Sequence, residues 1–344
     1  MKLRSIARRA FAATPLPEAV FRHRAKQFLT VLGYHRIMPP AEADYAFNEG
    51  VISATPEEFA RELTFLRANL DVLSIPQLVA ALKDPRLMPQ RPAVITFDDG
   101  YVDNYTHAFP LLKEAGLTAC FFLCTALVGM RALPWTEAWV CCLKQSRVGR
   151  IESPFGEDDP PYLLDQANRA ASIRRFRQRM RLVAWSRVPR MLEWLSEATS
   201  VRPEEHLTEP LFMSWDAARE MAAAGMNMGG HTRTHPVLSC VDDRDVLRDE
   251  IGGCFEDLQT ELGERPLAFA YPFGSAEQMS ARADAEIERA GFQVLFSFIH
   301  GFAPRQTEGL CRLPRIHASV VDDYDGFRVR MATAPGANGK TWPG

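Results

Sequence analysis

The feature of the sequence that most constrains the fold is the alternation of short apolar runs of β type with segments of helical periodicity. The runs that we interpret as strands or strand ends are 27–35, 93–97, 118–125, 225–230, 267–274 and 292–298. Helical spacing appears between them in 55–70, 105–116 and 275–291, and the last two segments end in glycine. Apolar strands that alternate with helices are typical of a parallel sheet covered on both faces, or of a barrel. We therefore expect an α/β fold.

One segment, from about residue 131 to 212, breaks this alternation because it carries little strand signal. Within it, one helical face carries Ile173, Phe176, Met180 and Val183, arginines occupy the other faces, and Pro189 interrupts the pattern. We predict a helical insertion between two strands of the main domain. Its basic face could attract an anionic polymer, although charge runs of this kind are usually solvated surfaces.

Two adjacent carboxylates, Asp98 and Asp99, stand where the apolar run 93–97 ends. Functional sites in parallel α/β folds gather at the carboxyl ends of the strands, and buried carboxylates need a proton, a cation or hydrogen-bond donors. His231 and His235 stand four residues apart, so they share one side of a helical turn or meet in a tight loop. Two histidines and one carboxylate form a facial metal triad that leaves positions for water and substrate. We predict Asp99, His231 and His235 as metal ligands and Asp98 as the general base.

The overall charge and the cysteines indicate the compartment and exclude some partners. Lys and Arg number 40 against 43 Asp and Glu, a formal net charge of -3, so no whole-chain field favours nucleic acid or acidic lipid. No stretch reaches the roughly 18 to 20 uncharged apolar residues of a membrane span. The seven cysteines show no C-x-x-C spacing, which fits buried free thiols in a reducing compartment. We expect a cytoplasmic protein.

The two ends of the chain are predicted to lie outside the main domain, which we place at residues 28–330. In the basic segment 1–27, an apolar stripe stands opposite basic residues; the stripe is Leu3, Ile6, Ala7, Ala10 and Phe11. This stripe could lie on an anionic membrane surface, at the inner face of the membrane, or pack as an ordinary helix on its own domain. Residues 331–344 are predicted to form a flexible tail.

Four motifs then point to a family. The segments "TFDDG" (96–100), "HTRTH" (231–235), "FAYPFG" (269–274) and "LPRIH" (313–317) resemble, in order, the motifs of the polysaccharide deacetylases, carbohydrate esterase family four. The start "LTVLGYHRI" is similar to the first strand of many members, and the resemblance spans roughly 28–318. It implies a distorted (β/α) barrel of about seven parallel strands that binds a divalent metal ion, commonly Zn2+. It also implies hydrolysis of N-acetyl groups on amino sugars, or of O-acetyl groups in some members.

The resemblance also implies residue roles. Asp98 would take a proton from the attacking water, and His317 would protonate the departing amine. The backbone N–H of Tyr271 would hold the oxyanion together with the metal, because Pro272 has no N–H to give.

Two positions depart from the family pattern. Ala270 stands where an arginine often orients the catalytic base, and 292–302 lacks the aspartate that often orients the acid histidine. Arg265, Arg312 or Arg315 could replace the missing arginine. His35, at the end of the first strand, could face the pocket or belong to the core.

Three functions remain open at this point. The first is a metal-dependent deacetylase acting on an acetylated glycan or glycan precursor. The second keeps the fold and the metal but hydrolyses a non-sugar amide or imide. The third is a glycan-binding protein that has lost turnover, which the two departures would explain.

Overall fold

The fold is built on a closed barrel of seven parallel strands. The computed structural model describes residues 11, 14–41, 45–131, 133–307, 309–310, 312–318 and 323–336. The barrel strands are β1 (Thr30–Tyr34), β5 (Pro92–Phe97), β6 (Cys120–Leu123), β9 (Asn227–Gly230), β10 (Ala268–Ala270), β11 (Val294–His300) and β12 (Arg312–His317). They are hydrogen-bonded in the order β1-β12-β11-β10-β9-β6-β5, and pairing of β1 with β5 closes the ring. The predicted (β/α) barrel of about seven strands is confirmed.

The barrel is irregular, and one of its strands has no counterpart among the predicted runs. β10 and β9 share a single register pair, Phe269 with Gly230, and the pairing of β11 with β12 shifts register between Phe296 and His300. β12 carries Arg312 and Arg315, which interrupt the apolar pattern by which the other strands are recognised. The remaining strands are short: β4 (Asp71–Val72) on the edge of β5, β2 (Arg36–Ile37) with β3 (Ile52–Ala54), and β7 (Arg150–Ile151) with β8 (Tyr162–Leu163).

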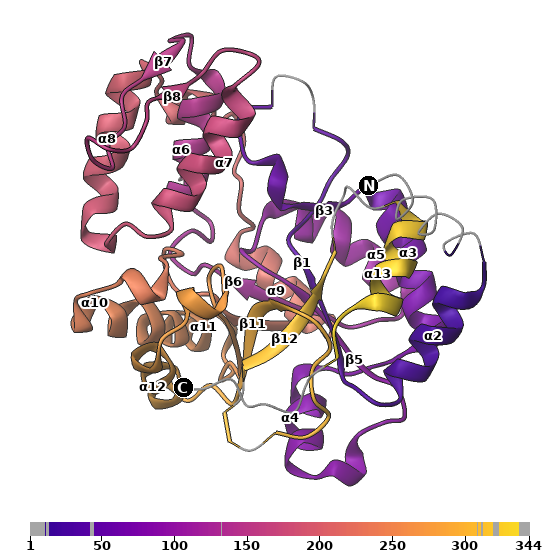
Figure 1. Cartoon of the computed structure of the whole chain (residues 1–344). Helices are drawn as coiled ribbons and strands as arrows, with labels where there is room; N and C mark the ends of the chain where they lie inside the picture. The colour runs from indigo at the N-terminus through magenta and orange to yellow at the C-terminus, as the bar shows by residue number, and fades with distance from the viewer. Residues whose placement is uncertain are drawn as a thin grey trace.

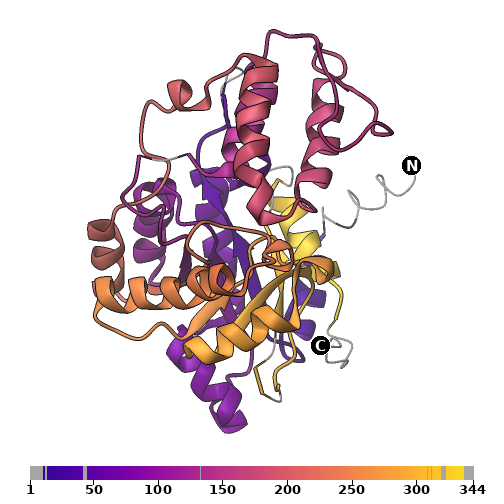
Figure 2. The same cartoon turned by 90° about the vertical axis from the view of Figure 1, so that its left-hand side faces the viewer.

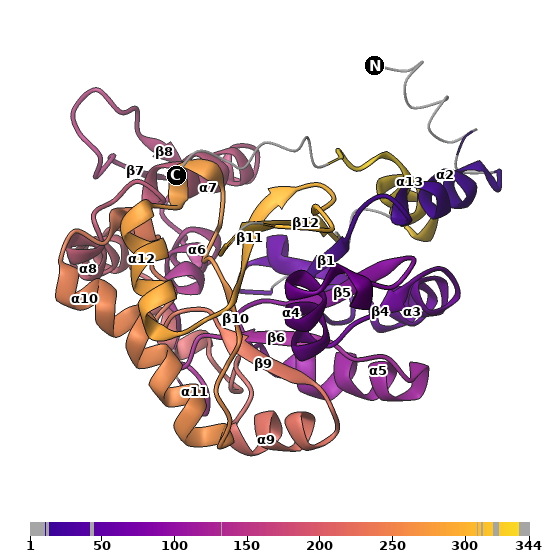
Figure 3. The same cartoon turned by 90° about the horizontal axis from the view of Figure 1, so that it is seen from below.

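Helices surround the barrel, as the view from below shows (Figure 3). They are α2 (Leu16–Ala25), α3 (Pro56–Asn69), α4 (Ile75–Lys83), α5 (Phe109–Ala115), α9 (Trp215–Ala223), α10 (Arg244–Arg248), α11 (Cys254–Leu262), α12 (Ala281–Ala290) and α13 (Tyr324–Thr333). Thr55 caps the start of α3, because its hydroxyl accepts from the Glu58 N–H at 3.2 Å. α5 and α12 end at Gly116 and Gly291, which take the left-handed conformation at φ 66° and 107°.

The segment between β6 and β9 forms a helical unit above one end of the barrel (Figures 1 and 2). Its helices are α6 (Trp135–Gln145), α7 (Arg169–Met180) and α8 (Val188–Thr199). Phe176 and Met180 are buried, with Trp139 and Tyr162, in a core that the insertion shares with loop residues of the barrel such as Tyr101. The predicted role of Pro189 is wrong: α7 already ends at Met180, and Pro189 lies in the first turn of α8, where a missing N–H costs nothing.

The two ends of the described chain lie beside each other, where α2 and α13 run along the same side of the barrel (Figure 1). α13 continues to Thr333, and the Pro335 carbonyl accepts from the Phe302 N–H at 2.9 Å, so the tail boundary predicted at residue 331 lies too early. Residues 337–344 and most of the N-terminal stripe lie outside the described residues. Among the described helices, none has the length and apolar character that a membrane span requires.

Close packing at β9 gives a first prediction, on stability. A Cβ at Gly229 would stand 2.6 Å from the Phe122 ring and 2.8 Å from the Ala268 carbonyl oxygen. We expect Gly229→Ala to lower the free energy of unfolding by about 1 to 3 kcal/mol, because neither neighbour can withdraw without moving the barrel wall. Urea denaturation would measure this. Gly149→Ala, which adds a Cβ with no atom within 4 Å, is the control, and equal midpoints for the two variants would contradict this packing.

Candidate metal centre

The carboxylates at the end of β5 diverge because the chain turns sharply there. The Asp98 N–H still donates to the Tyr34 carbonyl of β1 at 2.9 Å, but Asp99 and Gly100 take positive φ values of 75° and 82°. The positive φ of Gly100 favours glycine, and a Cβ there would also stand 2.8 Å from a methyl group of Leu123. The turn sends the two side chains in different directions. Both carboxylates are buried, and each meets a different partner.

The two histidines are brought together by a tight loop after β9, and not by a helical turn. Thr232 and His235 have φ values of 67° and 65°, and the His235 N–H donates to the Thr232 hydroxyl at 3.0 Å. Glu250 holds the loop from outside by accepting the N–H groups of Arg233 and Thr234 at 3.0 and 2.9 Å. Glu250 was not among the predicted residues, and nothing in the sequence around it marks this role.

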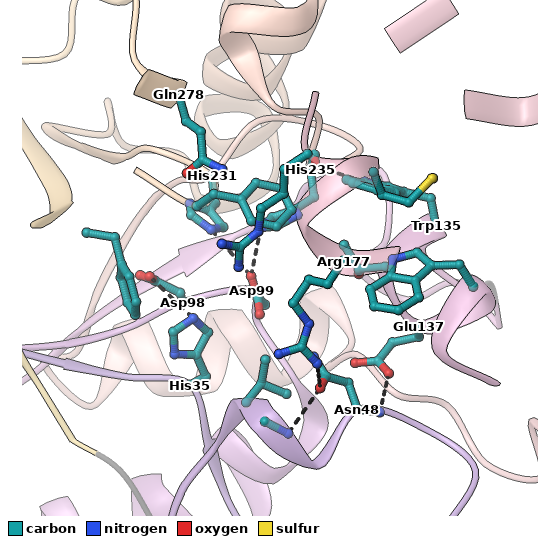
Figure 4. A pocket seen from close by; sticks show the side chains of 18 of the residues that line it. His35, Asn48, Asp98, Asp99, Trp135, Glu137, Arg177, His231, His235 and Gln278 are labelled. Atoms are coloured by element: carbon teal, nitrogen blue, oxygen red, sulfur yellow. Dashed lines mark hydrogen bonds and ion pairs between the residues drawn. The ribbon is translucent and has the colours of Figure 1, made fainter. Parts of the chain in front are cut away.

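Asp99, His231 and His235 converge on one point (Figure 4). The Nε2 atoms of His231 and His235 lie 3.3 and 3.2 Å from the same oxygen, Oδ1 of Asp99. One potential ligand atom from each residue lies within 4.8 Å of the other two. The structure thus assembles the three predicted ligands from the ends of β5 and β9.

The hydrogen bonds around these side chains fit a cation between them. Nδ1 of His231 lies 2.7 Å from the Ala270 carbonyl oxygen, which can only accept, so Nδ1 carries a hydrogen and the lone pair of the neutral ring is on Nε2. That lone pair faces Oδ1 of Asp99, a buried oxygen without a hydrogen-bond donor among the described residues. Two facing acceptors repel unless a positive charge lies between them. The residues present therefore fit a divalent metal ion.

The pKa shifts of Asp99 and His231 also favour a negatively charged Asp99 next to positive charge. Burial alone would raise the pKa of Asp99, but the neighbouring imidazoles hold it well below its usual range. Burial alone would lower the pKa of His231, but the adjacent Asp99 carboxylate and the charge of Asp98 raise it. The site therefore keeps Asp99 ionised.

Asp98 has a cationic partner, which the sequence left open among three arginines. Arg315 of β12 is fully buried, and its NH1 and NH2 groups donate to the two Asp98 oxygens at 2.7 Å each. Burial raises the pKa of Asp98, but Arg315, together with His231 and His35, more than offsets this and the net shift is downward. Arg312 instead pairs with Asp284, and Arg265 lies over the Phe255 ring, so neither takes this position.

The predicted oxyanion donor is wrong. The Tyr271 N–H donates to the Phe296 carbonyl at 3.0 Å as part of the pairing of β10 with β11, and the Tyr271 side chain is fully buried. It is therefore not available to a substrate. After Pro272, which has no N–H, the next amide is that of Phe273, a pocket residue with φ 61° and no acceptor for its N–H within the described part of the chain.

His317 does not reach the pocket as predicted. Its ring stacks on Phe298 with centroids 3.6 Å apart, and its Nε2 is buried without a partner among the described residues. Burial, assisted by the charge of Arg315, lowers the pKa of His317 to about 2. His35 is the imidazole that faces the pocket next to Asp98, with Nε2 3.8 Å from Oδ2. Its pKa is lowered by burial.

The pocket at Asp99, His231 and His235 has a volume of about 240 Å³, and residues of the helical insertion form part of its lining. From the barrel come the ligands, His35, Phe273 and Phe298, while the insertion contributes the side chains Trp135, Glu137, Trp139, Arg177 and Arg181. The Trp135 indole N–H donates to the His235 carbonyl at 2.9 Å, so the insertion also holds the loop that carries the two histidines. The pocket therefore combines aromatic side chains, cationic side chains and the predicted metal ligands.

Comparison with known proteins agrees with the geometry. The sequence profile of the family described as polysaccharide deacetylase matches residues 86–295. A poly-β-1,6-N-acetyl-D-glucosamine N-deacetylase of Escherichia coli strain K12 is 25% identical over 293 residues, which cover 83% of this chain and 36% of that protein. A putative polysaccharide deacetylase of Bacillus subtilis is 32% identical over 102 residues, covering 29% of this chain and 33% of that one. The chain thus spans only about a third of the length of these curated relatives.

Solved structures share the fold. The deacetylase PplD of Streptococcus pyogenes, solved in complex with acetate, aligns with a TM-score of 0.59 at 18% identity, covering 88% of this chain and 98% of that one. IcaB of Ammonifex degensii aligns with a TM-score of 0.54 at 18% identity, covering 89% and 98%. At this identity the likeness establishes the architecture of the barrel and says nothing of its substrate.

Proposed function

The chain belongs to the polysaccharide deacetylase family, and we propose that it is a metal-dependent hydrolase that removes N-acetyl groups from an amino-sugar-containing glycan. The observation that carries this proposal is the meeting of two imidazole Nε2 atoms and a buried carboxylate oxygen beside an Asp98–Arg315 pair, inside a pocket. This arrangement provides a metal site and a separate base, which are the two requirements for hydrolysing an amide with water.

The metal would be held by Asp99, His231 and His235, and a set of two histidines and one carboxylate suits Zn2+. When bound, the ion would lower the pKa of water and polarise the acetyl carbonyl. Asp98 takes one proton as the water oxygen bonds to the acetyl carbon, and Arg315 keeps Asp98 ionised and oriented for this step. The C–N bond then breaks, the amine takes up a proton, and the products are acetate and the free amino sugar.

The remaining roles go to groups that face the pocket. The Phe273 N–H is the candidate donor to the oxyanion, in place of Tyr271. His35 is the candidate to protonate the departing amine, because it lines the pocket beside Asp98 and His317 does not. The family motif implies this role for His317, so the proposal moves it from His317 to His35.

A pair of variants tests which of the two histidines has this role. We expect His35→Gln to lower kcat by about 10² or more, the range for loss of a general acid. His317→Gln should lower it by less than about tenfold, since it alters only a ring stacked behind Phe298. Acetate release with metal-loaded protein measures both, and thermal melting shows whether each variant is folded. A larger loss of kcat in His317→Gln would restore the role that the motif implies.

The substrate panel separates this function from the alternatives. Acetate release from β-1,4- or β-1,6-linked N-acetylglucosamine oligomers supports an N-deacetylase, release from O-acetylated sugars alone supports an esterase, and turnover of cyclic imides alone supports the second function. Binding of oligomers with no turnover on any substrate would support a glycan-binding protein.

A cytoplasmic location stays part of the proposal and is supported by the six described cysteines, which are all free thiols.

A further inference from the structure

Two arginines of the insertion, Arg177 and Arg181, face the same pocket as the predicted metal ligands. Arg177 lies in the last turn of α7 and Arg181 directly follows the helix, so one helical turn separates them. We propose that this pair binds a phosphate group of the substrate, which is then an acetylated amino sugar esterified to phosphate or diphosphate. The inference rests on the proposed deacetylase function and specifies the substrate class of that site.

The two guanidinium groups have no carboxylate partner, unlike other arginines of the same helix. Arg175 and Arg179 lie 4.0 and 3.7 Å from the carboxylate of Asp159, while no ion pair joins Arg177 or Arg181 to a carboxylate of the described residues. The nearby Glu137 is already occupied, since its two oxygens accept from the Tyr101 hydroxyl and the Asn48 N–H at 2.7 Å each. The positive charges of the pair therefore remain available to an anion from outside the protein.

Both groups are also poorly solvated and poorly hydrogen-bonded. Burial lowers the pKa of Arg177, although the charge of Glu137 offsets part of this effect. Burial also lowers the pKa of Arg181, and the charge of Arg177 lowers it further. Arg177 donates to Asn48 Oδ1 at 2.9 Å, toward which it points in Figure 4. Nε of Arg181 is buried and has no acceptor among the described residues. A half-buried cation without a counter-ion is unfavourable, and a bound phosphate would supply both the charge and the acceptors.

The pair is at a suitable place for a phosphate next to an acetamido group. The Arg181 guanidinium lies 5.1 Å from the centre of the Phe273 ring, and that ring is centred 4.9 Å from the ring of His235. Arg181 and a predicted metal ligand are therefore neighbours of the same aromatic ring. In a 2-acetamido sugar 1-phosphate, the amide and the phosphate are on adjacent carbons, so a sugar resting on Phe273 could present one group to each of these two neighbours.

The balance of charge in the pocket favours the same class of substrate. Its carboxylates are Asp98, Asp99 and Glu137, and its arginines are Arg177, Arg181 and, behind Asp98, Arg315. These charges cancel, so a divalent ion on Asp99 would leave the pocket with two positive charges. A neutral glycan chain would leave these two positive charges without a counter-charge, whereas the negative charge of a phosphate ester would neutralise them.

Binding measurements test the proposal without requiring turnover. Isothermal titration would compare N-acetylglucosamine 1-phosphate with N-acetylglucosamine on the metal-loaded full chain. We expect the phosphate ester to bind about tenfold tighter or more, and this ratio to fall toward one in the Arg177→Met/Arg181→Met double variant with metal content unchanged. The control is Arg175→Met/Arg179→Met, which removes the same charge from the same helix and should keep the ratio. If the first double variant does not fold, the two single variants replace it.

The outcomes are distinct. A ratio near one in wild type, or a ratio that the Arg177/Arg181 variants do not change, overturns the proposal; the second result would assign the phosphate to the metal alone. Tighter binding of uridine diphosphate N-acetylglucosamine, or of the same sugar diphosphate on a geranyl chain, would identify a nucleotide or a lipid as the carrier, and both support the proposal. Acetate release from neutral oligomers is followed separately, so the deacetylase function can fail while phosphate binding stands, and the reverse.

Discussion

Asp98→Asn is expected to lower kcat by roughly 10²- to 10⁴-fold while the protein keeps its metal. The physical reason is that asparagine fills the same space but cannot take a proton from water at neutral pH. Metal binding should persist because Asp99, His231 and His235, and not Asp98, have the atoms that converge on one point. Acetate release and elemental analysis on the same samples would measure both effects.

The control for this variant is Asp103→Asn. Asp103 also pairs with a buried arginine, since Arg36 Nε donates to its Oδ2 at 2.7 Å, and it lies outside the pocket lining. Both substitutions remove the charge partner of a buried arginine, so both should lower the melting temperature, but only Asp98→Asn should lower kcat by orders of magnitude. Retention of activity in Asp98→Asn would remove this residue from the mechanism.

Arg315→Met is expected to have a large effect both on stability and on the pH dependence of turnover. The substitution leaves the Asp98 charge buried without its partner, which typically costs about 3 to 5 kcal/mol of unfolding free energy. Arg315 lowers the pKa of Asp98, so its removal should raise that pKa. A base must be ionised to act, and the acid limb of kcat/KM should therefore move to higher pH.

The loss of unfolding free energy in Arg315→Met should depend on pH in a predictable direction. In wild type the Asp98 pKa is depressed by folding, so Asp98 stabilises the protein above its unfolded-state pKa and this contribution is lost as the pH falls. In Arg315→Met the unpaired carboxylate is relieved by protonation, so the deficit in unfolding free energy should shrink toward low pH. Arg312→Met is the control, because Arg312 pairs with Asp284. An acid limb at the same pH in wild type and in Arg315→Met would show that Arg315 does not tune Asp98.

The meeting of Asp99 with His231 and His235 could be predicted from the sequence because each motif directly follows an apolar strand. Strand ends in a parallel barrel meet at one rim, so Asp99 after β5 and His231 after β9 had to lie on the same side. The partner of Asp98 could not be chosen in this way. Nothing in the sequence distinguishes Arg315 from Arg265 and Arg312 as this partner. The position of β12 between β1 and β11 is what brings Arg315 against Asp98.

The roles predicted for the Tyr271 N–H and for His317 could not be checked from the sequence, because both depend on local strand pairing. Which backbone N–H is free depends on strand pairing, and the pairing of β10 with β11 consumes that of Tyr271. The orientation of His317 depends on the register shift between Phe296 and His300, which brings Phe298 against the His317 ring. Neither the pairing nor the shift leaves a trace in apolar periodicity. The arginines of the insertion were recognised as basic, but only the folded chain separates those that meet Asp159 from those that face the pocket.

The most direct test of the account is metal content measured together with acetate release, on wild type and on a His231→Ala/His235→Ala variant. The matched control is His23→Ala/His206→Ala, which removes two histidines that do not line the pocket. We expect about one divalent ion per chain and acetate release from N-acetylglucosamine oligomers in wild type and control, with both lost in the ligand variant. Metal and acetate release that persist without His231 and His235 would contradict the account.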